Sequence, residues 1–143
     1  MKLSNIFCMN INAIRNRYNG DNELDISDKI TDFAINNDGE SMIPYPTDEY
    51  ATAWADNFKE QVVDRPFFVI GFSDGQFIRK LLNNTNGTNY IYVYEPDIYS
   101  FINVLNVYDM TDFVGSKRLI ICVEGINEDS LFDIIHCAVH YGN

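Results

Sequence analysis

Residues 66–97 read PFFVIGFSDGQFIRKLLNNTNGTNYIYVYEPD, and this stretch decides the fold. It contains a continuous apolar run at 67–70 and a second run at 91–94 that is β-branched and aromatic. Between the two runs lie a turn of mostly small residues at 71–75 and a segment whose apolar residues recur at helical spacing. An apolar strand, a Gly-containing turn, a helix and a second apolar strand make a βαβ unit, which requires a parallel sheet covered by helices.

The same alternation of helix and strand continues after this unit. Apolar residues return at helical spacing over 98–105, a turn follows at 110–115, and residues 119–123 form a third apolar run. Asn127 is placed to cap a last helix. Three βα units of this kind make half of a doubly wound sheet, and right-handed crossovers predict the strand order 3-2-1. The predicted fold class is α/β, with a Rossmann-like partial parallel sheet.

The first 64 residues predict elements that pack beside the sheet. Residues 4–18 indicate an amphipathic helix with Ser4 as its N-cap, whereas residues 21–31 show no assignable pattern. Residues 32–45 predict a β-hairpin, in which Phe33 and Ile35 face a second apolar run across the turn Asn37-Asp38-Gly39-Glu40. Thr47 is expected to cap a helix that continues to about residue 62.

These patterns divide the chain into two predicted regions. Residues 1–64 form the flanking helix, hairpin and helix, and residues 65–143 form the βαβαβα unit. No fourth or fifth strand is legible in the sequence. We expect the chain to be one part of a longer protein.

Composition and charge exclude several classes of function. The net charge is −11, and residues 21–64 hold twelve of the 21 acidic residues, so nucleic acid and anionic membrane are not expected partners. No apolar run approaches the roughly 18–20 residues of a membrane span. The first residues lack a signal peptide, which predicts a cytoplasmic protein. Cys8, Cys122 and Cys137 form no CxxC motif and are expected to be buried, reduced thiols.

A candidate ligand site follows from the ends of the strands. In a doubly wound sheet, ligands bind in the crevice beyond the carboxyl ends of the strands. The turn GFSDG resembles the first motif of folds that bind nucleotides or S-adenosylmethionine, although Ser73 and Gln76 stand where the G-x-G-x-x-G fingerprint has glycine. Glu95 follows near the roughly 20-residue spacing at which such folds place a ribose-binding carboxylate. The candidate cofactor-binding residues are Gly71, Ser73, Gly75, Glu95, Asp97 and Glu124.

Two other interpretations of these residues stay open. The turn is equally compatible with a tight connection that binds nothing, and Glu95 with a carboxylate that caps the next helix. His136 and His140 lie four residues apart, as in zinc sites, but the sequence offers neither the HExxH glutamate nor an evident third ligand. We therefore predict no metal site and no catalytic residues in this chain.

Short motifs along most of the chain point to a family. They are a helix containing Phe7 and Asn12-Ala13-Ile14, the turn at 37–39, YPTDE with AWA at 45–55, FVIGFSDG at 68–75, and VYEPD at 93–97. Together these motifs resemble the N-terminal domain of the motility-associated-factor proteins, the flagellin glycosyltransferases of bacteria. Members of that family typically have Gly-x where this chain has Ser73-Asp74, and Tyr-His is common where it has Gln76-Phe77.

The resemblance implies a specific role. In that family, a Rossmann-like N-terminal domain precedes a central domain that transfers nonulosonic sugars to Ser and Thr of flagellin. By resemblance, this chain is a noncatalytic accessory domain whose partners are a downstream glycosyltransferase domain and flagellin, and no cofactor is expected. The alternatives are an S-adenosylmethionine-dependent methyltransferase-like domain and a nucleotide-sugar-binding module, whose ligands would be S-adenosylmethionine or a cytidine nucleotide.

Overall fold

The structure, a computed structural model, describes residues 4–17, 24, 26–36, 46–58, 66–85 and 89–127. Within these residues the elements alternate in the order expected of βα units after an all-helical beginning. The helices are α1 (Asn5–Arg17), α2 (Ser27–Asn36), α3 (Asp48–Asp56), α4 (Gln76–Asn84) and α5 (Ile98–Val107). The strands are β1 (Phe67–Ile70), β2 (Ile91–Glu95) and β3 (Leu119–Val123).

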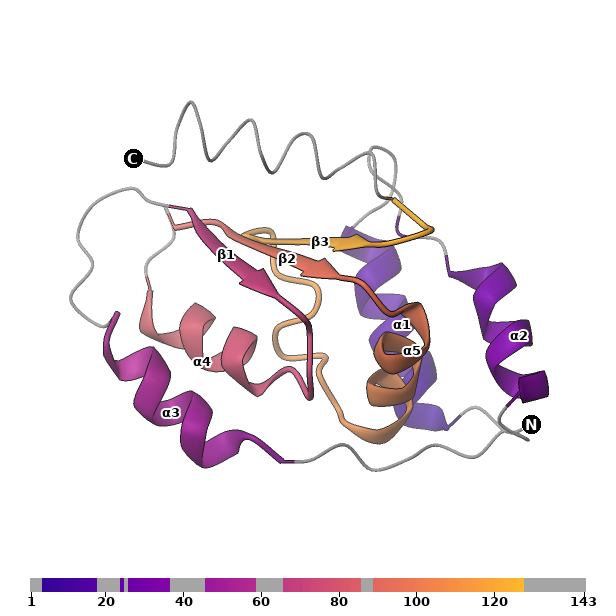
Figure 1. Cartoon of the computed structure of the whole chain (residues 1–143), viewed down its shortest axis with the longest axis horizontal. Helices are drawn as coiled ribbons and strands as arrows, with labels where there is room; N and C mark the ends of the chain where they lie inside the picture. Colours follow the sequence, from indigo (N-terminus) through magenta and orange to yellow (C-terminus); the bar gives the residue numbers. More distant parts are fainter. Residues whose placement is uncertain are drawn as a thin grey trace.

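The three strands form a parallel sheet in the order β1-β2-β3 (Figure 1). Phe67 lies opposite Ile91, which in turn lies opposite Leu119. This arrangement confirms the three predicted strands, and it is the predicted 3-2-1 order counted from the other edge. The chain thus has an α/β fold with a partial, Rossmann-like parallel sheet.

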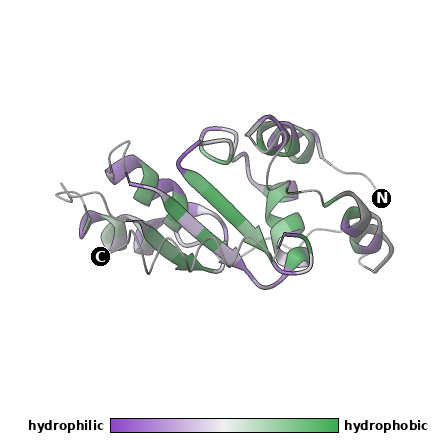
Figure 2. Cartoon of the chain, turned by 90° about the horizontal axis from the view of Figure 1, so that it is seen from above, coloured by the Kyte–Doolittle hydropathy of each residue, from purple (hydrophilic) through white to green (hydrophobic). Residues whose placement is uncertain are grey.

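Helices α4 and α5 lie on the same face of the sheet (Figure 1). Their apolar residues recur every three or four positions, so each helix buries one stripe against the strands. Figure 2 shows β1 and β3 as strongly apolar, whereas β2, which contains Tyr92, Tyr94 and Glu95, also has hydrophilic colours, as do the helices beside the sheet. The side chains that are fully shielded from solvent come from both crossover helices and from β2 and β3: Ile78, Leu81, Ile91, Val93, Phe101, Ile102, Leu105, Leu119, Ile121 and Val123.

The remaining helices extend this core sideways. Helix α3 packs on α4, and its Trp54 ring meets Phe77 edge to face at 5.4 Å. Helices α1 and α2 pack on α5. Asn10 of α1 is fully buried; its Nδ2 donates to the carbonyl oxygens of Leu105 and Tyr108 at 2.9 and 2.7 Å, which satisfies carbonyls at the end of α5. The flanking helices therefore share one core with the βα units.

Helix α1 confirms the predicted amphipathic helix and its cap. The backbone N–H of Phe7 donates to Ser4 Oγ at 3.0 Å, the geometry of an N-cap. Phe7, Ile11 and Ile14 are all buried, as their spacing predicts. The predicted last residue of this helix, Tyr18, lies outside the described residues.

The predicted hairpin is wrong in its first strand, because Phe33 lies in helix α2. Ile26, Ile30 and Phe33 recur at helical spacing and form the apolar stripe of this segment. The alternation of Phe33 with Ile35, which suggested a strand, does not decide its structure. Phe33 is 3 % exposed and its ring stacks on Tyr99 of α5 at 6.5 Å. The turn at 37–40 and the second strand lie outside the described residues.

Three smaller expectations also differ from the structure. Thr47 stands at the N-cap of α3 but makes no side-chain cap bond, because its hydroxyl donates to Asp74 instead. Cys8 is exposed, whereas Cys122 is buried as predicted. Asn127 Oδ1 accepts from the N–H of Val123 at 2.7 Å, and the helix that Asn127 is predicted to cap lies outside the described residues. The helix predicted to continue to about residue 62 ends at Asp56, and residues 59–62 lie outside the described residues. Residue 137, the two histidines and most of the predicted last helix also lie outside them.

Candidate functional site

The turn between β1 and α4 has an unusual backbone. Gly71, Ser73 and Gly75 adopt positive φ values of 88°, 53° and 83°. Glycine takes this conformation without a steric penalty, and Ser73 is the only other residue type found there in the described part of the chain. The alternating backbone brings the residues of the turn above the carboxyl ends of β1 and β2.

The two glycines of this turn have different surroundings. A Cβ atom on Gly75 would lie 3.0 Å from both Met110 Sδ and Phe113 Cζ, so this glycine faces the core. A Cβ on Gly71 would meet nothing within 4 Å. Gly75 is therefore required by packing, and only the Gly71 side of the turn is open.

Asp74 joins the starts of two helices. It is 2 % exposed, and its Oδ1 accepts hydrogen bonds from Thr47 Oγ1 at 2.5 Å and from the N–H of Gln76 at 3.2 Å. Its Oδ2 accepts from the N–H of Thr47 at 2.9 Å. Since α3 begins just after Thr47 and α4 begins at Gln76, one carboxylate interacts with the positive ends of both helices. This is the position at which helix N-termini bind phosphate in nucleotide-binding folds.

Glu95 ties the end of β2 to the turn. It is 5 % exposed, and its Oε1 accepts from the N–H of Phe72 at 3.1 Å. Its Oε2 accepts from the N–H of Asp97 at 3.0 Å. Each oxygen of this buried carboxylate is thus already engaged by a backbone donor of the chain.

Asp97 and Glu124 complete the predicted set, but they face different neighbours. Asp97 is the N-cap of α5 and accepts from Tyr99 N at 3.0 Å and from Ser100 Oγ at 2.8 Å. Glu124 accepts from the hydroxyl of Tyr94 at 2.6 Å. Because Tyr94 and Glu95 are consecutive in a strand, their side chains point to opposite faces of the sheet. The Glu124 carboxylate therefore lies with Tyr94, apart from the carboxylate of Glu95.

The structure brings five of the six predicted residues together: Gly71, Ser73, Gly75, Glu95 and Asp97 surround the carboxyl ends of β1 and β2. Sequence reasoning missed Asp74, the residue that connects most of the local donors. An Asp before Gly in a turn is a known signal for a side-chain-to-backbone bond two residues on. Its bonds to Thr47 join residues 27 positions apart, and no local pattern could have shown them.

Positive charge near the turn is paired with carboxylates. Arg79 of α4 makes a bidentate pair with Asp112, at 2.9 Å from Nε and 3.0 Å from Nη2, and its guanidinium lies 4.9 Å from the centre of the Phe113 ring. Lys80 lies 3.6 Å from Asp48. The cations of α4 thus hold neighbouring elements against the helix.

A separate cavity of about 310 Å³ lies at the amino-terminal end of the sheet and is lined by Ala13, Asn16, Gly115 and Lys117. None of the predicted site residues borders it. In the described part of the chain, no group of three or more His, Cys, Asp and Glu side chains is arranged to hold a metal ion. The described helices include none that is long and apolar enough to cross a membrane.

Comparison with protein-family models, with curated proteins and with solved structures finds no match to this chain. Its function is therefore inferred from its own residues.

Proposed function

We propose that this chain is a noncatalytic, Rossmann-like accessory domain that acts through protein contacts in the cytoplasm. The parent protein that fits best is a flagellin glycosyltransferase of the motility-associated-factor type, in which a downstream domain transfers the nonulosonic sugar. The observation that supports this proposal is the occupation of the crevice donors by Asp74 and Glu95. The proposed partners are the downstream domain and flagellin.

The N-terminus of α4, where a nucleotide phosphate would bind, already interacts with the Asp74 carboxylate. A nucleotide phosphate at the start of α4 would take the place of the Asp74 carboxylate, which accepts from Gln76 and from Thr47. Removing that acceptor would leave the part-buried donors of Thr47 unsatisfied, at a cost of roughly 1–3 kcal/mol for each group that is fully shielded. Leaving Asp74 in place would set two anions side by side. The turn does not fit a phosphate.

The ribose position leads to the same conclusion. A ribose-binding carboxylate must offer its oxygens to hydroxyl donors, but both oxygens of Glu95 accept backbone N–H bonds and the residue is 5 % exposed. Its bond to Phe72 holds the turn against the end of β2. Glu95 therefore has a structural reason to stand at this position.

One observation favours the alternative, a domain that binds S-adenosylmethionine or a nucleotide sugar. Gly71 has open space beside its Cα, and Ser73 is exposed at the top of the turn. Close approach of a ligand to the backbone uses such a position in Rossmann folds. This alternative requires Glu95 to exchange its bond to Phe72 for bonds to a ligand.

Thermal unfolding separates the two candidates. The protein is heated alone and with S-adenosylmethionine, its demethylated product, or a cytidine nucleotide, and we expect no change in Tm. A ligand present at 100 times its Kd would add about 2.7 kcal/mol and raise Tm by several degrees. A rise that is lost in Glu95→Ala would contradict the noncatalytic proposal.

The glycosyltransferase context has a separate test. Sequencing the gene beyond the codon for Asn143 should show a large downstream domain, and a stop codon at that point would contradict the assignment. Deleting residues 1–143 from the parent protein should lower sugar transfer to flagellin, measured as the mass of intact flagellin. Transfer at an unchanged rate would show that the domain has no accessory role.

A further inference from the structure

The outer edge of β1 has no partner strand among the residues that the structure describes. β1 is the terminal strand of the sheet, and the N–H groups of Phe67 and Gly71 donate to Tyr90 and Tyr94 at 2.8 and 2.7 Å. Because backbone groups alternate in direction along a strand, the N–H and C=O of Phe68 and Ile70 point away from β2. No other described strand pairs with them.

The side chains along this edge are apolar and exposed. Ile70 is 83 % exposed and Phe68 is 42 % exposed, and the Phe68 ring stacks on Tyr92 of β2 at 5.3 Å. Edge strands of soluble proteins are usually protected by lysine, proline or a bulge. β1 is four residues long and follows Pro66, but within the strand it has neither lysine nor proline, so its apolar edge can pair with a short further segment.

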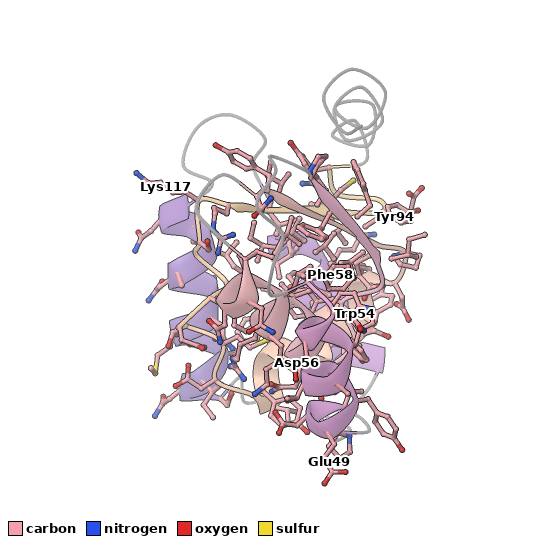
Figure 3. All side chains as sticks on the ribbon, turned by 90° about the vertical axis from the view of Figure 1, so that its left-hand side faces the viewer. Glu49, Trp54, Asp56, Phe58, Tyr94 and Lys117 are labelled. Atoms are coloured by element: carbon pink, nitrogen blue, oxygen red, sulfur yellow. The ribbon has the colours of Figure 1, made fainter. Side chains whose placement is uncertain are left out.

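The charge beside this edge selects the kind of segment. Helix α3 lies close to β1 at both of its ends. Phe58, two residues beyond its last residue, meets Phe67 edge to face at 5.3 Å, and Thr47, just before its first residue, bonds to Asp74 in the turn after β1. α3 carries three exposed acidic residues (Asp48, Glu49 and Asp56) and no basic one. Asp48 lies 3.6 Å from Lys80 of α4 and Asp56 accepts from Asn84, so the helix adds to the net negative charge of the chain chiefly through Glu49. Figure 3 shows Glu49 and Asp56 on this side of the molecule, with Trp54 on the same helix and Phe58 just beyond its end.

We propose that the outer edge of β1 binds an extended segment of a partner protein by strand addition. The segment has β-branched or aromatic residues at alternate positions, which cover Phe68 and Ile70, and Lys or Arg residues at its ends, which face the acidic side chains of α3. A second copy of this chain would be a poor occupant, because each copy carries a net charge of −11 and the two would repel. This inference stands independently of the sugar-transfer context.

A defined peptide tests the proposal. The probe is Lys-Lys-Val-Thr-Val-Thr-Val-Lys-Lys, and its binding is followed by calorimetry and by the amide resonances of Phe68 and Ile70. Ile70→Lys should weaken binding at least about tenfold, since it removes apolar contact and adds a like charge. Ile70→Pro should weaken binding as well, because it removes an outward N–H while the bonds of residues 67, 69 and 71 to β2 remain.

Matched controls distinguish strand addition from adsorption. Met9→Lys makes the same chemical change at an exposed residue of α1, where Met9 is 49 % exposed, and should leave binding unchanged. Two further peptides carry N-methyl groups on one or the other backbone edge, and only one of them should bind. Equal binding of both methylated peptides, or of Ile70→Lys and the natural protein, would overturn the proposal.

The choice of occupant has its own outcomes. Replacing the four lysines of the peptide by glutamate should abolish binding, and salt should weaken binding of the basic peptide. Equal affinity for the acidic peptide would overturn the charge assignment. Sedimentation of the protein alone should give a monomer; a dimer that Ile70→Lys dissociates would show that a second copy occupies the edge instead. Circular dichroism of every variant confirms that it is folded.

Discussion

The turn that follows β1 and the outer edge of β1 differ in how their backbone donors are satisfied. At the turn, buried carboxylates from Asp74 and Glu95 accept from the N–H groups of Thr47, Phe72 and Gln76. Along the edge, the outward groups of Phe68 and Ile70 have no partner among the described strands. A Rossmann-like sheet ordinarily offers its free donors at the crevice. In this chain carboxylates accept from the crevice donors of Thr47, Phe72 and Gln76, whereas no described strand pairs with the outward groups of Phe68 and Ile70, and this difference favours recognition of a peptide over recognition of a nucleotide.

The largest loss of stability should come from placing a side chain on a glycine of the turn after β1. Gly75→Ala combines a φ of 83° with contacts of 3.0 Å to Met110 and Phe113, and we expect a loss of about 2–4 kcal/mol in the free energy of unfolding. Gly71→Ala shares the positive φ but meets nothing within 4 Å, so its loss should be about 1–2 kcal/mol. Urea unfolding measures both. Equal losses would mean that packing does not distinguish the two ends of the turn.

Removal of the Asp74 carboxylate should come next. Asp74→Ala leaves the donors of Thr47 and Gln76 without their acceptor, and we expect a loss of about 2–3 kcal/mol in the free energy of unfolding. The control is Asp112→Ala, whose carboxylate is 59 % exposed and pairs with Arg79 at the surface. That change should cost less than about 1 kcal/mol. A similar cost for both would argue that Asp74 is an ordinary surface carboxylate.

Glu95→Gln should have a smaller effect of about 1–2 kcal/mol, because the side-chain amide keeps one acceptor and sets a donor against a backbone N–H. The amide of Phe72, which donates to Glu95 at 3.1 Å, should exchange its hydrogen faster in this variant. Hydrogen exchange followed by NMR measures the change. Unaltered protection of the Phe72 amide would remove Glu95 from the structural role assigned to it.

Changes along the edge should leave stability nearly unaffected. Ile70→Lys replaces an 83 % exposed side chain, so the free energy of unfolding should change by less than about 0.5 kcal/mol. Ile91→Ala, a fully buried position in the next strand, should cost about 2–5 kcal/mol in the same urea experiment. A large loss for Ile70→Lys would show that the chain itself covers the edge.

The smallest effect concerns an exposed carboxylate that resembles Asp74 in its partners. The hydroxyl of Thr111 and then its backbone N–H lower the pKa of Asp109 below its ordinary value of 3.8. Because the folded-state pKa of Asp109 is lowered, its ionised carboxylate stabilises the folded state at every pH above the ordinary pKa. This stabilisation is lost as the pH falls through the lowered pKa of the folded state. Thr111→Val should raise the pKa of Asp109 toward 3.8, measured by carboxyl carbon NMR. An unchanged pKa would exclude the hydroxyl as its cause.

The sheet could be predicted from the sequence because its signals are local. The runs at 67–70, 91–94 and 119–123 are continuous and apolar or aromatic, as buried parallel strands require, and the segments between them have helical spacing. Right-handed crossovers with both helices on one face of the sheet then place three consecutive strands side by side in chain order. Helix α2 was mistaken for a strand because Phe33 and Ile35 alternate with polar residues, whereas Ile26, Ile30 and Phe33 supply the stripe that packs.

The candidate site could be predicted only in its location. Glycines and carboxylates at strand ends show where a crevice lies, and Gly71, Ser73, Glu95 and Asp97 do gather there. What satisfies the donors depends on contacts between distant segments, such as that of Asp74 with Thr47. The exposure of Ile70 likewise depends on which strand lies at the edge of the sheet. The apolar run at 67–70, taken by itself, predicts a buried strand.

The most direct test of the central claim is an amide NMR titration of the natural protein with a cytidine nucleotide and, separately, with S-adenosylmethionine. The account predicts that the N–H resonances of Phe72 and Gln76 stay in place up to about 1 mM ligand, because Glu95 and Asp74 already accept their hydrogen bonds. A saturable shift of both resonances would contradict it and would show that the crevice exchanges its own carboxylates for a ligand.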